Sequence, residues 1–111
     1  MKDDKTYLGH ILDAIDKVNV YTTEGRDAFM ADGKTQDAVV RNLEIVGEAT
    51  KRLSDEIRAR HPDIPWKKAA ALRDVLSHDY MGIDLTILWN VIESHLPDLR
   101  KSVEVLLDEV A

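Results

Sequence analysis

Apolar residues recur every three or four positions along nearly the whole chain, which is the spacing of an amphipathic α-helix. The first such stretch predicts a helix over about residues 4–23. Its apolar stripe consists of Leu8, Ile11, Ile15 and Val18. Gly25 interrupts the pattern, and the segment RDAFMAD predicts one or two further turns before Gly33.

The middle of the chain carries the clearest helical pattern and predicts one continuous helix over about residues 35–60. Its stripe consists of Val39, Leu43, Val46, Leu53 and Ile57, with Thr50 filling the gap. The segment HPDIP should end this helix, because each proline disfavours the helical conformation in the residue before it.

Two further helices are predicted in the second half. The segment PWKKAAALRDVLS predicts a shorter helix with Pro65 at its first position, where proline is tolerated. Asp84 is placed to cap a last helix that runs to the C-terminus. Pro97 should kink that helix or split it in two, because proline removes a backbone donor and crowds the preceding turn.

These elements predict an all-α fold, namely an antiparallel four-helix-type bundle with a kinked C-terminal helix. No run of alternating β-branched residues competes with the helical pattern. The length of 111 residues suits a single domain over residues 1–111. The stripes are wide, and two tryptophans and three tyrosines are many for so small a core. We therefore expect a helix-pair interface with a second copy.

Composition narrows the class of protein. The chain has no cysteine, which excludes disulfides, thiolate zinc sites and cysteine nucleophiles. The charged start lacks a signal core, and no uncharged run approaches the roughly 18 apolar residues of a membrane span. We expect a cytoplasmic protein without a membrane partner. The net charge of −6 argues against a broad grip on nucleic acid but permits a local basic cleft.

The segment ALRDVLSHDYMG contains the candidate chemistry. Arg73 and His78 are five residues apart, so on one helix they would point about 140° away from each other. A permanently charged guanidinium and a titratable imidazole suit chemistry at a phosphodiester. From the spacing alone the structural interpretation is favoured, namely an arginine that pairs with a carboxylate and a histidine that ends a helix. The catalytic interpretation stays open beside it.

Metal chemistry finds no support in the remaining histidines. His10, His61 and His95 lie in different segments, without the spacing of metal ligands. No glycine-rich loop is present to cradle a phosphate.

Two acidic residues on the long helix are further candidates. Glu44 and Glu48 share one helical face. They are either a solvated face that pairs with arginines such as Arg41 or Arg52, or one of them orients Arg73 across the bundle.

From Asp37 to Leu107 the chain resembles the HepT-like family of small HEPN-domain proteins. The segment AVVRNLEIVGEATKRLS resembles the long helix of the family, and PDIPWKKAAALRDVLSHDYMGIDLTILWNVIESHLPDL resembles the signature helix and the entry into the last helix. Arg73, His78 and Tyr80 match the signature Arg-x4-His-x-Tyr. The residue after the arginine is often asparagine in the family and is Asp74 here.

The resemblance implies a HEPN-like homodimer whose two signature segments face each other across a cleft. It implies a metal-independent ribonuclease toxin without a cofactor, in which Arg73 and His78 are catalytic and Asp74 is a supporting position. The substrate would be RNA, such as tRNA or mRNA. The partner would be a minimal nucleotidyltransferase antitoxin that silences the toxin by transferring AMP to Tyr80.

Two other functions remain open at this point. One is a non-catalytic HEPN companion module that binds a nucleotidyltransferase or a nucleotide. The other is a purely structural helical dimer. The acidic net charge favours the companion module over the nuclease.

Overall fold

A computed structural model describes residues 2–78 and 84–110 of the chain, and the side chains of residues 3–72 and 84–110. Within these ranges the structure is helical and contains no strand, which confirms the all-α class. The elements are α1 (Lys2–Tyr21), α2 (Arg26–Ala31), α3 (Gly33–Lys51), α4 (Asp55–Arg60), α5 (Trp66–His78), α6 (Leu85–Asn90), the π-helical turn η2 (Val91–His95) and α7 (Leu96–Val110).

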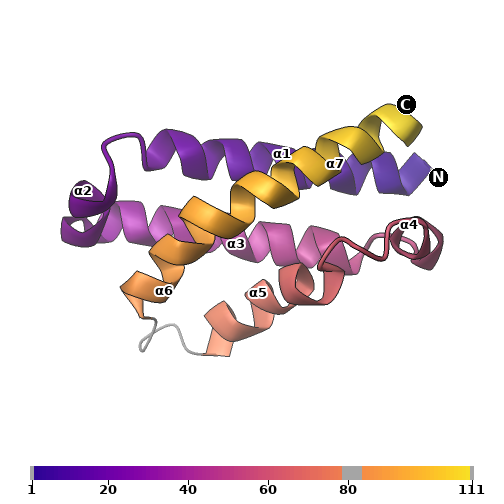
Figure 1. Ribbon diagram of the computed structural model, residues 1–111. Helices are drawn as coiled ribbons and strands as arrows, with labels where there is room; N and C mark the ends of the chain where they lie inside the picture. Colours follow the sequence, from indigo (N-terminus) through magenta and orange to yellow (C-terminus); the bar gives the residue numbers. More distant parts are fainter. Residues whose placement is uncertain (1, 79–83, 111) are drawn as a thin grey trace.

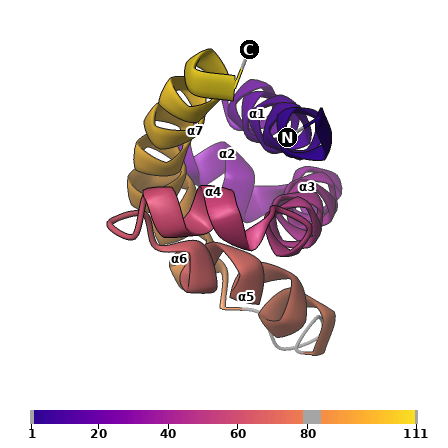
Figure 2. The same ribbon diagram turned by 90° about the vertical axis from the view of Figure 1, so that its right-hand side faces the viewer.

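Four long segments run alternately up and down to form the bundle (Figure 1). They are α1, α3, α5 and the path from α6 through η2 to α7. α3 packs against both α1 and α5, and α7 packs against α1. In the end-on view of Figure 2, α3 lies between α1 and α5, while α6 and α7 close the opposite side. The predicted antiparallel bundle is therefore confirmed.

The predicted stripes form the core. The side chains of the first stripe, from α1, are completely buried, and those of α3 and α4 meet them in the interior. The largest fully buried side chains are Phe29, Leu8, Ile11, Ile15, Leu43, Ile57, Leu96, Leu106, Val18, Val39, Val46 and Val103. Thr50 is also buried, and its hydroxyl donates to the Val46 carbonyl at 2.7 Å, which explains how a polar residue fits the stripe.

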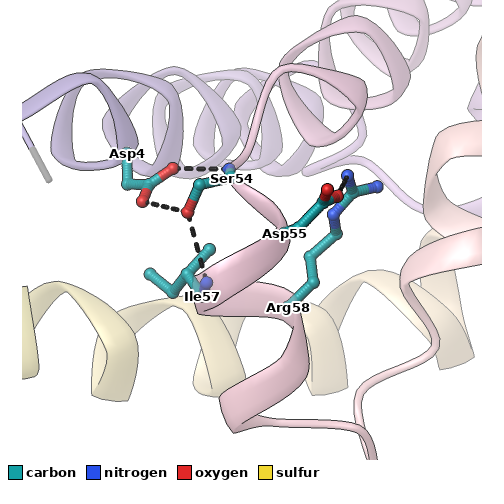
Figure 3. Close-up of polar contacts among 5 residues, drawn as sticks. All are labelled: Asp4, Ser54, Asp55, Ile57 and Arg58. Carbon is teal, nitrogen blue, oxygen red and sulfur yellow. Dashed lines mark hydrogen bonds and ion pairs between the residues drawn. The ribbon is translucent and has the colours of Figure 1, made fainter.

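The prediction of one continuous helix over residues 35–60 is wrong, because α3 ends at Lys51 and α4 begins at Asp55. Ser54 caps α4, since its hydroxyl oxygen accepts from the Ile57 N–H at 3.2 Å. The carboxylate of Asp4, only 1% exposed, accepts from the Ser54 N–H at 2.7 Å and from its hydroxyl at 2.6 Å (Figure 3). These contacts with α1 fix the break between the two helices.

The remaining boundaries follow from local residues. α5 begins one residue after Pro65, whose carbonyl accepts from the Ala69 N–H at 3.0 Å. Asp84 caps α6 by accepting from the Thr86 N–H at 2.8 Å, as predicted.

Pro97 affects the last helix in the predicted way. The π-helical turn ends two residues before it and separates α6 from α7. The carbonyl of Glu93, which would face the missing N–H of Pro97 in a regular helix, lies within this turn. Along the described ranges, no helix has both the length and the hydropathy that crossing a membrane requires.

Candidate functional site

The signature residues lie at the end of α5. Arg73, Asp74 and His78 belong to the helix, which is unbroken between them. Their side chains are outside the described part of the structure, and Tyr80 lies outside the described residues altogether. In a regular α-helix, five residues correspond to a rotation of about 140° and a rise of about 7.5 Å. Positions 73 and 78 of α5 therefore belong to different faces of the helix.

α5 is held against the bundle by its first two turns. Trp66 and Ala69 are buried and Leu72 is partly buried, so the helix turns one apolar edge inward. The indole N–H of Trp66 donates to the His61 carbonyl at 3.0 Å, which ties the start of α5 to the end of α4. From there α5 runs antiparallel to α3, and its C-terminal half passes beneath the middle of α3 (Figure 1).

The middle of α3 carries a polar strip that faces away from the core. Together with two aromatic residues of α1 it lines a pocket of about 440 Å³. The lining residues are Tyr7, His10, Arg41, Glu44, Ile45, Glu48, Ala49 and Arg52.

The sequence identified some members of this pocket and missed others. Glu44 and Glu48 were candidates because of their shared helical face, and His10 was considered only as a metal ligand. Tyr7 carried no signal beyond its spacing of three residues from His10. That the two rings lie beside α3 depends on how α1 packs, which a local pattern does not contain.

The charges at one end of the pocket are paired. Arg52 Nε lies 3.1 Å from a Glu48 carboxylate oxygen, and the Arg52 guanidinium carbon lies 6.0 Å from the centre of the Tyr7 ring. The pKa of Arg52 is raised, first by hydrogen bonding with Tyr7 and then by Glu48. The Glu48–Arg52 pair agrees with the interpretation of Glu48 as a partner for an arginine. An orienting role toward Arg73 stays a prediction.

The rings of Tyr7 and His10 meet edge to face, with centroids 5.8 Å apart and planes at 82°. Such an arrangement is a preferred geometry for aromatic pairs. It gives the pocket an aromatic wall on the side of α1, opposite the charged strip of α3.

A second pocket, of about 310 Å³, lies between the start of α5 and the η2–α7 segment. Its lining is largely aliphatic, and Lys68 Nζ lies 3.0 Å from His95 Nε2 at its edge. Lys68 is ten residues, or about 15 Å, from His78 along α5. This pocket nevertheless reaches Leu72, the residue before Arg73. The pocket on α3 lies along the helix that α5 packs against.

An up-and-down helical bundle that carries an Arg-x4-His-x-Tyr signature at the end of its third long helix defines the class of small HEPN proteins. The family model described as "Ribonuclease HepT-like" matches residues 11–106, a range that includes the whole signature. The chain belongs to this HepT-like ribonuclease family.

The curated relatives agree with the family. The chain is 41% identical to the "Probable ribonuclease HepT" of Thermococcus cleftensis over 92% of this chain and 94% of that protein. It is 39% identical to a protein of Caldanaerobacter subterraneus subsp. tengcongensis that is named "Putative RNase", over 98% of both chains.

A longer relative contains a region that is similar to this chain. The chain is 40% identical to a Methanocaldococcus jannaschii protein named "Gamma-glutamylcyclotransferase and putative RNase", over 98% of this chain. It spans only 50% of that relative's length. No solved structure gives a significant match.

Proposed function

We propose that the protein is a metal-independent RNA endonuclease and the toxin of a toxin–antitoxin pair, acting as a single HEPN-like domain. Arg73 and His78 are its catalytic residues, at a cleft between two copies of the chain. The observation that carries this proposal is the Arg73-x4-His78-x-Tyr80 signature, which falls inside the range that matches the HepT-like ribonuclease family.

Two copies supply the groups that hydrolysis-free cleavage of RNA needs. The imidazole of one copy accepts the proton of the ribose 2'-hydroxyl as its oxygen bonds to phosphorus. The protonated imidazole of the other copy gives its proton to the 5'-oxygen as the P–O5' bond breaks. The products are a 2',3'-cyclic phosphate and a 5'-hydroxyl. Each such proton transfer typically contributes about 10²–10⁴-fold in rate.

Arg73 has a different task in this scheme. Its guanidinium holds a non-bridging oxygen and stabilises the charge that gathers on the phosphorane. Asp74, next to it in sequence, supports the position of the guanidinium. The 140° divergence of Arg73 and His78 on one helix favours a site in which each phosphate meets side chains from both copies.

A minimal nucleotidyltransferase antitoxin silences this activity in our proposal. The hydroxyl of Tyr80 gives up its proton to a base, its oxygen bonds to the α-phosphorus of ATP, and pyrophosphate leaves. The resulting AMP group adds bulk and negative charge two residues from His78. It therefore excludes RNA by volume and by repulsion.

Purified protein incubated with total RNA or tRNA in excess chelator tests the nuclease. We expect wild type to cut, and the Arg73→Ala and His78→Ala variants to lose at least about 100-fold in rate. Arg26→Ala in α2 and His95→Ala in η2 are matched controls at exposed positions and should cut normally. Cleavage that requires added metal, or undiminished cleavage by His78→Ala, would contradict the proposal.

The alternative is a non-catalytic companion module that binds a nucleotidyltransferase or a nucleotide. The net charge of −6 and the aspartate beside Arg73 favour it, since both weaken attraction for RNA. In that case His78→Ala would leave growth effects and partner binding unchanged. The same variant therefore separates the two functions.

A further inference from the structure

Four charged side chains line the pocket between α1 and α3, and two of them, Arg41 and Glu44, have no partner among the described residues. Glu48 and Arg52 pair with each other, as described above. Arg41 and Glu44 line the same pocket, and neither side chain makes a hydrogen bond or an ion pair with any residue the structure describes. Arg41 is exposed, and Glu44 is half-buried.

The half-buried carboxylate is the informative member of this pair. Removing a carboxylate from water costs free energy unless hydrogen bonds replace the lost hydration. Glu44 lies in a hollow of about 440 Å³, a size that small ligands occupy in proteins. Its unmatched oxygens are therefore positioned to accept hydrogen bonds from a ligand that carries donors.

The lining indicates which part of a nucleic acid would enter. A phosphate would be repelled by Glu44 and Glu48, whereas a base edge with N–H donors would be attracted. A carboxylate offers two acceptor oxygens side by side. Guanine is the base whose Watson–Crick edge presents two adjacent donors, N1–H and the N2 amine. Single-stranded RNA is commonly recognised through such edges and through stacking on aromatic rings.

The other residues of the pocket complete this match. Tyr7 and His10 supply a wall of aromatic rings on the α1 side. Arg41, three residues before Glu44 and thus on the same helical face, places a cation at the edge of the hollow. Its guanidinium can hold the phosphate that is attached to a base bound inside.

The pocket is also placed for this role. α3 lies between α1 and α5 in both views (Figures 1 and 2), and the C-terminal half of α5 passes beneath the middle of α3 in Figure 1. Packed helices have axes about 8–10 Å apart. Adjoining nucleotides of one strand cover such a span, so a base in the pocket and a phosphate at the signature can belong to the same RNA.

We propose that this pocket is a guanine-recognition subsite that selects where RNA is cut. Glu44 accepts the N1–H and N2 amine of the base, Tyr7 and His10 contact its face, and Arg41 holds its phosphate. The inference rests on the proposed ribonuclease function and adds the sequence preference of the same site.

Short single-stranded RNA substrates with one variable base test the subsite. We compare guanine, inosine, which lacks the N2 amine, and adenine at that position. Wild type should cleave in the order guanine, inosine, adenine, with guanine ahead of adenine by about ten-fold or more in kcat/KM. Glu44→Gln should reduce that ratio to near one. The exposed Glu56→Gln in α4 is the matched control and should keep the wild-type ratio.

The other outcomes distinguish failure of the subsite from failure of the nuclease. Cleavage without a preference for guanine would contradict the subsite and would leave the proposed nuclease function supported. A changed oligomeric state of Glu44→Gln, with unchanged base preference, assigns the pocket to a contact between copies. If wild type does not cleave at all, NMR titration with GMP and AMP tests whether the pocket binds guanine. Chemical-shift changes that are confined to pocket residues and occur with GMP alone would support the subsite. Equal changes with both nucleotides, or no changes, would contradict it.

Discussion

At the scale of single residues, loss of the buried contact between Asp4 and Ser54 should clearly lower the free energy of unfolding. Asp4→Ala removes both hydrogen bonds to Ser54 and leaves two donors at a partly buried position. Bonds to a charged group contribute more than neutral ones, so we expect a loss of about 2 kcal/mol or more in the free energy of unfolding. Urea denaturation followed by circular dichroism measures it.

Asp3→Ala is the matched control, because Asp3 is the exposed neighbour in the same first turn of α1. It should cost at most about 0.5 kcal/mol. Ser54→Ala should itself cost about 1–2 kcal/mol through the lost cap. The double variant Asp4→Ala/Ser54→Ala should lose less stability than the sum of the two single losses, because both substitutions remove the same contact. Full additivity would show that the contact is not coupled.

At this scale, some residues of the candidate site could be identified from the sequence, and others only from how the helices pack. Arg73, His78 and Tyr80 were identified from the sequence, because a signature is a local feature of spacing. Glu44 was noted for its helical face, and Arg41 as a possible partner for a glutamate on that face. That neither side chain has a partner among the described residues, and that both lie beside the rings of α1, depends on contacts between helices far apart in the chain. No local pattern encodes such contacts.

At the scale of the element, the cap of α3 should respond to pH. Asp32 accepts from the Lys34 N–H at 3.0 Å and from the Thr35 hydroxyl at 2.8 Å. The hydrogen bond from the Thr35 side chain is the largest cause that lowers the pKa of Asp32 below 3.8. Because the pKa is lower in the folded chain, the cap stabilises α3 above pH 4 or so and is lost as pH falls through the folded pKa.

Thr35→Val keeps the shape of the side chain and removes its hydroxyl. We expect the pKa of Asp32 to rise toward the ordinary value, as measured by NMR titration of its carboxyl carbon. Lys34→Gln is the control, because Lys34 lowers the pKa of Asp32 mainly through its backbone N–H, and its charge contributes least. A larger rise with Lys34→Gln than with Thr35→Val would contradict this account.

The elements also show where sequence reasoning about the fold stops. The stripes of α1, α3 and the last helix were predictable because burial enforces the helical period. The effect of Pro97 was predictable because the missing N–H is a property of the residue. The break after Lys51 was not, although Ser54 followed by two acidic residues is a capping signal. The apolar stripe continues across this break, and the contact that fixes the break comes from Asp4, fifty residues from Ser54.

At the scale of the whole molecule, the proposed dimeric cleft can be tested by mixing inactive copies. Arg73→Ala retains His78, and His78→Ala retains Arg73. If each phosphate meets side chains from both copies, a mixed dimer presents one guanidinium and one imidazole at the same cleft. The single imidazole must then accept the 2'-hydroxyl proton and later give a proton to the 5'-oxygen, so we expect the mixture to recover only a small fraction of wild-type cleavage. That fraction should still exceed the activity of either variant alone.

Subunit exchange must be demonstrated for this result to count, for example by mass spectrometry of differently tagged copies. Arg26→Ala exchanged with His78→Ala is the matched control, and it sets the activity of a dimer with one intact signature. Mixed dimers that form and stay inactive, while the control dimer cuts, would place a complete site within each chain. That outcome would also require Arg73 and His78 to converge on one phosphate from a single helix, against their 140° divergence. The experiment therefore tests the helical geometry and the assembly together.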